Sequence, residues 1–282
     1  MLMTPPMITR APRDMATWAA CFDVATLPIL AETAEVLEAL RANEDEVDAH
    51  MLADTISSDP LMTLKLLAHV ARLRRSRDPD ARTETETVTA CLVLLGIGPF
   101  FRAFGPQTSV ETVLQDQPEA LQGFRDVLRR SHRAANFAIA FAVHRMDHDA
   151  SVIHEAALLH DFAEMLLWLR APQLALQIAE RKRSDPTLRS AAAQRELLNI
   201  ELPDLQQALM IEWRLPHCLV RINDERHADT DQVRNVLLAI RLARHSANGW
   251  DNPALPDDVA DIAQLLQLGL EPTWKLLRDI DA

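Results

Sequence analysis

Apolar side chains recur at three- and four-residue steps along most of the chain, the spacing that places them on one face of an α-helix. In the stretch "TLPILAETAEVLEAL", residues 26–40, such a stripe is formed by Leu30, Leu37 and Leu40. No stretch shows the alternation of apolar and polar residues that is typical of a strand. The pattern predicts an all-α protein with many short to medium helices.

Residues that begin helices stand at the expected places beside these stripes. In "ISSDP", residues 56–60, Ser58 or Asp59 can cap a helix that Pro60 opens. Upstream, Thr26 can cap a helix with Pro28 in its first turn, where the missing N–H of proline is harmless. We therefore predict helix starts near residues 26 and 60.

The same reasoning extends to the rest of the chain. Thr85 or Thr87 can cap a helix that Gly96 ends. The periodicity predicts further helices at 122–146, 172–182, 188–199, 203–213, 216–224, 231–247, 257–268 and 271–280. The basic stretch "RLRRSR", residues 72–77, is predicted as a solvated loop. Residues 1–24 are predicted as a loose N-terminal segment, in which Trp18 could dock on the body of the protein or on a partner.

Composition narrows the class of protein. The chain has 282 residues, 48% of them hydrophobic, and a formal net charge of -12. An acidic chain repels phosphate backbones, so nucleic-acid binding is disfavoured. The three cysteines are far apart and form no Cys-x-x-Cys pair, which argues against disulfides and structural zinc. No apolar run reaches the length of a membrane span, so we expect a cytoplasmic protein.

The stretch "ALLHDFAEMLLWL", residues 156–168, places three ionisable groups in an apolar helix. If this is one helix, Glu164 lies on the same face as His160 and Asp161. His132 opens a preceding amphipathic helix and can pair with them. Imidazole and carboxylate groups on neighbouring helices suit divalent metals, whereas a hydrogen-bonded cluster that joins the two helices is the simpler alternative.

Several stretches together resemble one known family, the HDOD ("HD-related output domain") proteins of bacteria. They are regulatory relatives of the metal-dependent phosphohydrolases named for a His-Asp motif. The resemblance covers about residues 25–280. The stretches that carry it are "LPILAETAEVL", "LADTISSDPLMTLKLLAHV", "TETVTACLVLLGIGPFFRAF", "SHRAANFAIAFA", "HEAALLHDFAEMLLW", "QRELLNIELPDLQQALMIEWRLP" and "NVLLAIRLARHSANG".

The resemblance implies a multi-helix HDOD fold in which two helical subdomains pack together. An N-terminal helical bundle would span residues 25–122. It would pack on a degenerate phosphohydrolase-like bundle at 123–282, after the loose segment 1–24.

The resemblance also implies what has happened to the catalytic centre. Active His-Asp enzymes use an early His, the His-Asp pair and a late Asp, and His132, His160 and Asp161 match the first three. Ile240 stands where the late Asp would fall. A metal that generates hydroxide needs a fixed and complete ligand set. We therefore expect no catalytic residues and no cofactor; a metal, if bound at all, would use His132, His160 and Asp161.

The family implies a non-enzymatic bacterial signalling module that acts through protein–protein interaction. Its partner would be a sensor kinase, a response regulator or a diguanylate cyclase. We expect no membrane partner. The sequence is compatible with a homo-oligomer. Two alternatives stay open. One is a metal-dependent phosphohydrolase of a nucleotide or cyclic dinucleotide, in which Glu164 or His227 replaces the lost ligand. The other is a nucleotide-sensing pocket without turnover.

Overall fold

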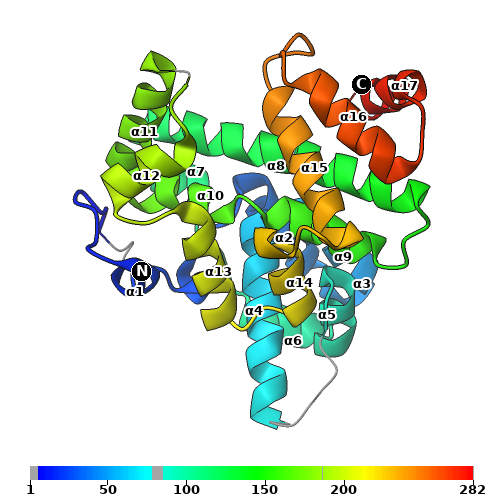
Figure 1. The fold of residues 1–282 in the computed structure, drawn as a ribbon. Coiled ribbons are helices and arrows are strands. Elements are labelled where there is room, and N and C mark those ends of the chain that lie inside the picture. Colours follow the sequence, from blue (N-terminus) through cyan, green and yellow to red (C-terminus); the bar gives the residue numbers. More distant parts are fainter. Residues whose placement is uncertain (1–5, 78–84, 186, 282) are drawn as a thin grey trace. The chain divides into compact units, whose positions relative to one another are not determined.

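The computed structural model describes residues 6–77, 85–185 and 187–281. Within these ranges the chain forms helices joined by turns, with no strand and a single isolated bridge between Ile29 and Ser109 (Figure 1). The predicted all-α class is confirmed. None of the described helices is both long and apolar enough to cross a membrane.

The N-terminal helices are α1 (Met15–Ala19), η1 (Val24–Thr26), α2 (Ala31–Ala42), η2 (Glu44–Glu46), α3 (Ala49–Ile56), α4 (Pro60–Arg77), α5 (Val88–Leu95), α6 (Ile97–Ala103) and α7 (Val110–Val113). The following helices are α8 (Pro118–His144), α9 (Ala150–Leu159), α10 (Phe162–Arg170), α11 (Pro172–Ser184), α12 (Ser190–Leu198) and α13 (Leu202–Glu212). The chain ends with α14 (His217–Ile222), η3 (Glu225–His227), α15 (Asp231–His245), α16 (Leu255–Leu266) and α17 (Leu270–Ile280). The eight helices predicted by periodicity after residue 120 all occur, each within a few residues of its expected ends.

Contacts divide the chain into two compact units. Unit 1 comprises Met1–Val127 and Asp161–Pro216, and unit 2 comprises Leu128–His160 and His217–Ala282. Each unit is therefore built from two separate stretches of sequence. This division follows a different line from the expected subdomains, whose boundary near residue 122 stays a prediction.

In unit 1, a buried carboxylate organises the first helices. Asp59 has no exposed surface, and its Oδ1 accepts hydrogen bonds from the backbone N–H groups of Leu61 (2.9 Å) and Met62 (3.0 Å). Its Oδ2 accepts from the N–H of Leu30 at the start of α2, at 2.7 Å. Burial raises the pKa of the Asp59 carboxyl, and the donated N–H groups oppose that rise. The predicted "SSDP" helix start is confirmed, with Asp59 as the cap.

The N-terminus of α2 differs from the prediction. Thr26 belongs to the short helix η1, where its hydroxyl donates to the carbonyl of Asp23, and α2 begins five residues later. Because Asp59 binds the Leu30 N–H from a distant segment, no local cap at Thr26 is required. A second correction concerns residues 72–77, which continue α4 and do not form a loop. The predicted cap at Thr87 and the stop at Gly96, with φ of 82°, are confirmed.

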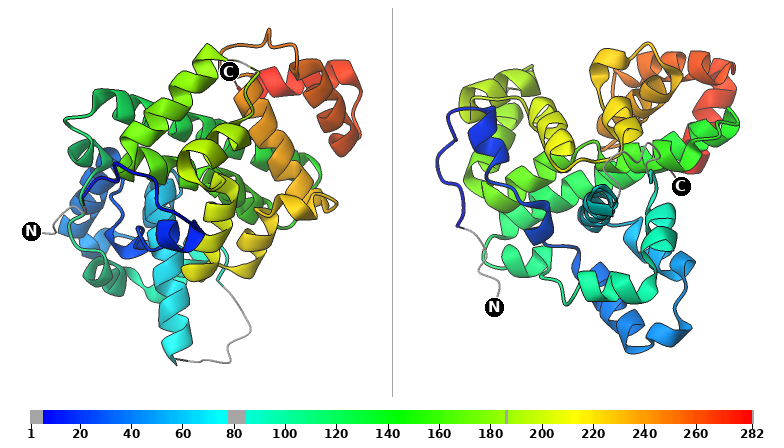
Figure 2. Two further views of the ribbon diagram at one scale, coloured as in Figure 1. Left: turned by 60° about the vertical axis from the view of Figure 1, so that its left-hand side comes forward. Right: turned by 90° about the horizontal axis from the view of Figure 1, so that it is seen from below.

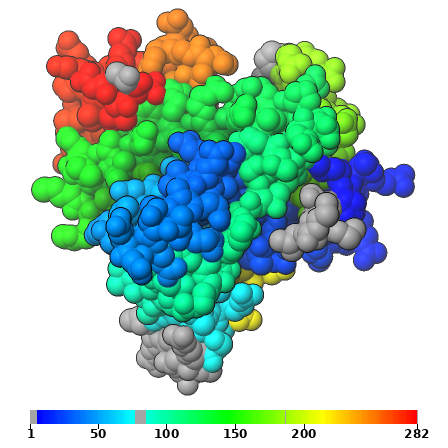
Figure 3. Space-filling view, turned by 180° about the vertical axis from the view of Figure 1, so that it is seen from behind, coloured from blue at the N-terminus to red at the C-terminus, as the bar shows by residue number. Residues whose placement is uncertain are grey.

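The helices α2, α3, α4 and α5 pack in sequence, and α3 also packs on α5. The atoms of α2 and α3 adjoin on the face seen in Figure 3. The second stretch of unit 1 adds the antiparallel pair α11 and α12, and α10 packs on both α11 and α13 (Figure 1).

The N-terminal segment is anchored, contrary to the prediction that residues 1–24 are loose. Asp14 caps α1, which packs on α13. Trp18 has no exposed surface, and its indole Nε1–H donates to the carbonyl of Leu198 at 2.8 Å. The alternative in which Trp18 docks on the body of the protein is confirmed for this part of the segment; residues 1–5 lie outside the described ranges.

Unit 2 consists of the second part of α8, α9 and the C-terminal helices. The helix α15 packs on α9, α14 and α16, and α16 packs on α17, as both views of Figure 2 show for the last three helices. Arg133 of α8 joins this group at its end, because its guanidinium forms an ion pair with Asp281 at 2.7 Å. The helix α15 is therefore the central element of unit 2.

The buried indole of Trp18 gives a stability prediction. Trp18→Phe keeps most of the apolar volume but removes the donor, so the Leu198 carbonyl loses its partner. We expect a loss of about 2 kcal/mol in the free energy of unfolding, measured by urea denaturation. Trp250→Phe is the matched control, because Trp250 is half-buried and contacts Trp274 through its ring. Equal losses for the two variants would contradict the proposed anchor.

Candidate functional site

The stretch "ALLHDFAEMLLWL" does not form one helix. The helix α9 ends at Leu159, His160 is its C-cap, and α10 begins at Phe162 with Asp161 as its N-cap. The His160 N–H donates to the carbonyl of Ala157, a tight three-residue step, and the Asp161 carbonyl accepts the first hydrogen bonds of the new helix. The expectation that His160 and Glu164 share one helical face is therefore wrong.

The four predicted site residues divide between the two units. His132, on α8, and His160 belong to unit 2, whereas Asp161 and Glu164 belong to unit 1. A single centre made from all four residues stays a prediction. Within the described ranges, no three His, Cys, Asp or Glu side chains lie in a group that would hold a metal ion.

His160 is nevertheless placed at a cavity that lies within unit 2. His160 is 6% exposed and lines a pocket with a volume of about 400 Å³. The walls are formed by α15, by η3 and the residue after it, and by α16. The other lining residues are Glu225, Ala228, Arg234, Leu237, Leu238, Ile240, Arg241, Arg244 and Asp261.

The wall that α15 contributes is basic and apolar. Its lining residues recur at helical spacing, so Arg234, Arg241 and Arg244 are presented along one side of the helix. Ile240, the residue that the family resemblance aligns with the late Asp of active enzymes, is 3% exposed and lines the same pocket as His160. The position therefore supplies a hydrocarbon side chain to the cavity.

Two carboxylates also line the pocket. Glu225 Oε1 lies 3.9 Å from His160 Nε2, and Asp261 pairs with Arg241. Arg234 donates to the side-chain oxygen of Gln264 at 2.7 Å. The lining described here thus contains three guanidinium groups and two carboxylates, and guanidinium groups carry donors only, so they cannot coordinate a divalent cation.

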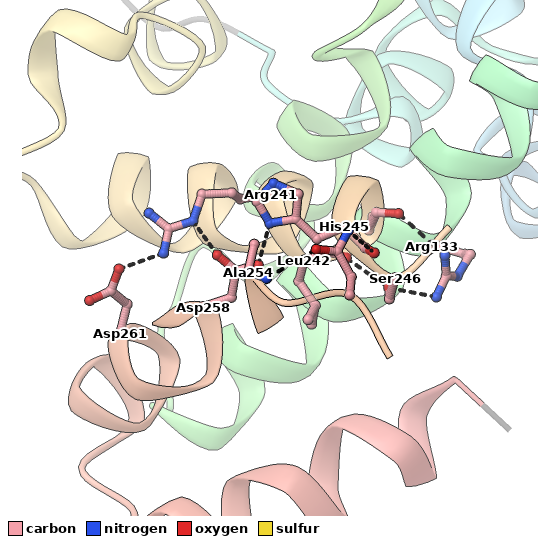
Figure 4. A network of polar contacts seen from close by, with 10 residues as sticks. Arg133, Arg241, Leu242, His245, Ser246, Ala254, Asp258 and Asp261 are labelled. Atoms are coloured by element: carbon pink, nitrogen blue, oxygen red, sulfur yellow. Dashed lines mark hydrogen bonds and ion pairs between the residues drawn. The ribbon is translucent and has the colours of Figure 1, made fainter. Parts of the chain in front are cut away.

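A polar network holds the basic wall in place (Figure 4). Asp258, at the start of α16, is 2% exposed and accepts from Arg241 Nε at 2.6 Å, while its other oxygen lies 2.5 Å from His245 Nδ1. Arg241 Nη2 reaches Asp261 at 2.5 Å. One buried carboxylate therefore fixes two side chains of α15, and with them the position of α15 against α16.

His132 has a neighbour that the sequence did not suggest. The helix α9 carries His154, and burial together with the charge of His132 lowers the pKa of His154. His227, the other predicted substitute ligand, lies in η3, where its Nδ1 is 3.2 Å from an Asp224 carboxylate oxygen. The pocket lining includes Glu225 and Ala228 but not His227.

Five residues of this pocket and its supporting network were not predicted from the sequence. They are Arg234, Arg241, Arg244, Glu225 and Asp258. Arg234, Arg241 and Arg244 do show a signal, because they repeat at helical spacing on a helix whose other side is apolar. Glu225 and Asp258 show none, since their role depends on where η3 and α16 are placed beside α15.

Comparisons with known proteins identify relatives. A family model described as the HDOD domain matches residues 27–228. The structure is similar to the MmoQ response regulator of Methylococcus capsulatus str. Bath, with a TM-score of 0.67 and 18% identity over 91% of this chain and 98% of that chain. It is also similar to a virulence factor of Campylobacter jejuni subsp. jejuni, with a TM-score of 0.65 and 18% identity over 94% of each chain. No curated protein matches. At this identity the structural likenesses show a shared fold.

The Asp258 network gives a matched pair of variants. Asp257 and Asp258 both lie in the first turn of α16, but Asp257 is exposed. Asp258→Ala leaves Arg241 and His245 without their shared carboxylate, so we expect it to cost about 2 kcal/mol more than Asp257→Ala in urea denaturation. Both variants lose a charge that favours the helix N-terminus. Similar costs would show that the network contributes nothing to stability.

The lowered pKa of His154 gives a pH dependence. As the pH falls below about 6.5, the unfolded chain takes up a proton at His154 before the folded chain does, so acidification reduces stability. Between pH 7.5 and 5.5 the melting temperature should therefore fall less steeply in His154→Gln than in the unmodified protein. His148→Gln, at an exposed position, is the control and should leave the slope unchanged. Identical slopes for all three proteins would refute the interpretation.

Proposed function

Because the chain belongs to the HDOD family, we propose that it is a non-enzymatic signalling module that acts by binding a protein partner. The observation that carries the proposal is the lining of the pocket at His160. Ile240 contributes no ligand there, and Arg234, Arg241 and Arg244 contribute positive charge.

Electrostatics supports this choice over a hydrolase. A dication next to His160 would be repelled by the guanidinium groups, and Arg241 already occupies the carboxylate of Asp261. Metal-assisted hydrolysis needs a ligand set that outcompetes such repulsion and holds the metal in a fixed geometry. The guanidinium groups and the hydrocarbon side chain of Ile240 around His160 offer no metal ligands.

The family and the structural relatives support a role in signalling. One neighbour of similar fold is named a response regulator. For this chain we infer a partner from the same kind of system, namely a sensor kinase, a response regulator or a diguanylate cyclase. The chain would act in the cytoplasm.

The proposal predicts that the protein has no hydrolase activity and that its cellular function does not require the pair His160 and Asp161. With Mn²⁺ added, the purified protein should hydrolyse none of a panel of nucleotides and cyclic dinucleotides above the uncatalysed rate. The double variant His160→Gln/Asp161→Asn keeps a polar side chain at both positions but removes good metal ligands. In a strain of the source organism that lacks the gene, the double variant should reverse the effect of the deletion as fully as the unmodified gene does. Turnover that the double variant abolishes would establish the enzyme instead.

Affinity capture from the native cell tests the partner directly. The unmodified chain and the double variant, used as separate baits, should retain the same signalling protein at comparable stoichiometry, identified by mass spectrometry. Purified bait and purified partner should then form a complex by size-exclusion chromatography. If the two purified proteins do not associate, the interaction part of the proposal is wrong.

A further inference from the structure

We propose that a second pocket, which lies within unit 1, binds a nucleotide. This pocket has a volume of about 440 Å³, inside the range typical of small-molecule sites. It is formed by α4, by η1, by the residues around the end of α6, and by the turn after α13. It shares no lining residue with the pocket at His160.

The deepest charged group of this pocket is Lys65. It stands in the apolar stripe of α4 and is 6% exposed. Its ammonium donates to the carbonyl of Leu27 at 2.7 Å and to the side-chain oxygen of Gln107 at 2.5 Å. An ammonium has three donors, and within the described residues no carboxylate forms an ion pair with it. A buried cation with neutral partners is stabilised when an anion enters.

Burial of the Lys65 side chain disfavours its charged form. Burial lowers the pKa of Lys65 to about 8, although the charges of Asp59 and Asp23 oppose the change. Lys65 therefore remains mostly charged at neutral pH. A bound anion would reduce this cost.

Two exposed arginines stand at the same pocket. Arg72 lies two turns after Lys65 on α4, and Arg214 follows α13. The described residues offer neither guanidinium an ion-pair partner. Arg214 also has a φ of 59°, in the left-handed region that favours Gly and Asn. The lining thus contains three cations and one carboxylate, Glu212, while Asp59 and Asp23 act on Lys65 from outside the lining, in a chain whose net charge is -12.

The remaining lining is uncharged or aromatic, and it consists of Val24, Ala25, Ala68, Ala103 and Gln107 together with the rings of His69, Phe104 and Trp213. Phe104 and Trp213 line the pocket and are 7% and 8% exposed. His69 packs on Phe104 with the ring centroids 5.1 Å apart. Guanidinium groups bind phosphate oxygens in a bidentate manner, and aromatic side chains contact the planar face of a base. A phosphate joined to a planar ring satisfies both parts of the pocket, which is why we assign a nucleotide rather than a simple anion.

Calorimetric titration of the full chain tests this assignment. The probes are GTP, ATP, GMP, guanosine and inorganic phosphate. We expect at least one nucleotide to bind with a dissociation constant below about 1 mM, and guanosine and inorganic phosphate to bind at least about tenfold more weakly. If no probe binds, or if inorganic phosphate binds as tightly as the best nucleotide, the assignment is wrong.

Variants locate the binding event. Arg72→Gln/Arg214→Asn removes both exposed cations, and Asn is well suited to the left-handed conformation at position 214. This double variant should lower the affinity at least about tenfold while the melting temperature stays close to that of the unmodified protein. Arg183→Gln/Arg189→Gln, at exposed positions of unit 1 away from the pocket, is the charge-matched control and should not change the affinity.

Arg234→Gln distinguishes this pocket from the one at His160. We expect it to leave nucleotide affinity unchanged. Loss of binding in Arg234→Gln, with full binding in Arg72→Gln/Arg214→Asn, would place the nucleotide at His160 and overturn the inference. None of these outcomes depends on whether the chain binds a protein partner.

Discussion

The N-terminal part of the molecule depends on one buried carboxylate. Asp59 has no contact with solvent, and its two oxygens bind the first turn of α4 and the start of α2. A carboxyl group at this depth is tolerated because backbone N–H groups hydrogen-bond to it in place of water. The same carboxylate fixes the course of α4, and α4 carries Lys65 into the pocket that we assign to a nucleotide. The "SSDP" signature is thus a folding element that also positions a binding element.

Unit 2 uses charge in a different way. There, Asp258 pairs with Arg241 and His245 and holds the basic side of α15 at the cavity next to His160. The family resemblance implies that an active His-Asp enzyme would carry the late Asp on this wall. Here it supplies Ile240 and three arginines. We base the proposed regulatory role on these side chains, because neither Ile240 nor an arginine can coordinate a metal ion.

Much of the helical pattern was predictable because it depends on local physics. Periodicity located the long helices, and capping residues such as Asp59 and Thr87 located their starts. The family resemblance, carried by short motifs in a fixed order, was also confirmed. The predictions were wrong where a contact with a residue far along the chain determines the local structure. The start of α2 depends on a hydrogen bond from Asp59, and Trp18 is buried because Leu198 offers it an acceptor.

The candidate site was less predictable than the fold. The break at His160 and Asp161 has no glycine or proline to mark it, so the apolar run predicts one continuous helix. Glu225 lies close to His160 because η3 packs on α15. The periodicity of the sequence does not predict a contact of this kind. Lys65 did leave a trace, as a lone cation in an apolar stripe. Its meaning becomes clear when Arg214, far along the chain, is placed at the same cavity.

The most direct test of this account is a calorimetric titration of the purified, chelator-treated protein with Mn²⁺. A pocket lined by Arg234, Arg241, Arg244 and Ile240 predicts no saturable binding tighter than about 1 mM. Stoichiometric binding with a dissociation constant near the micromolar range, lost in both His132→Gln and His160→Gln, would contradict it.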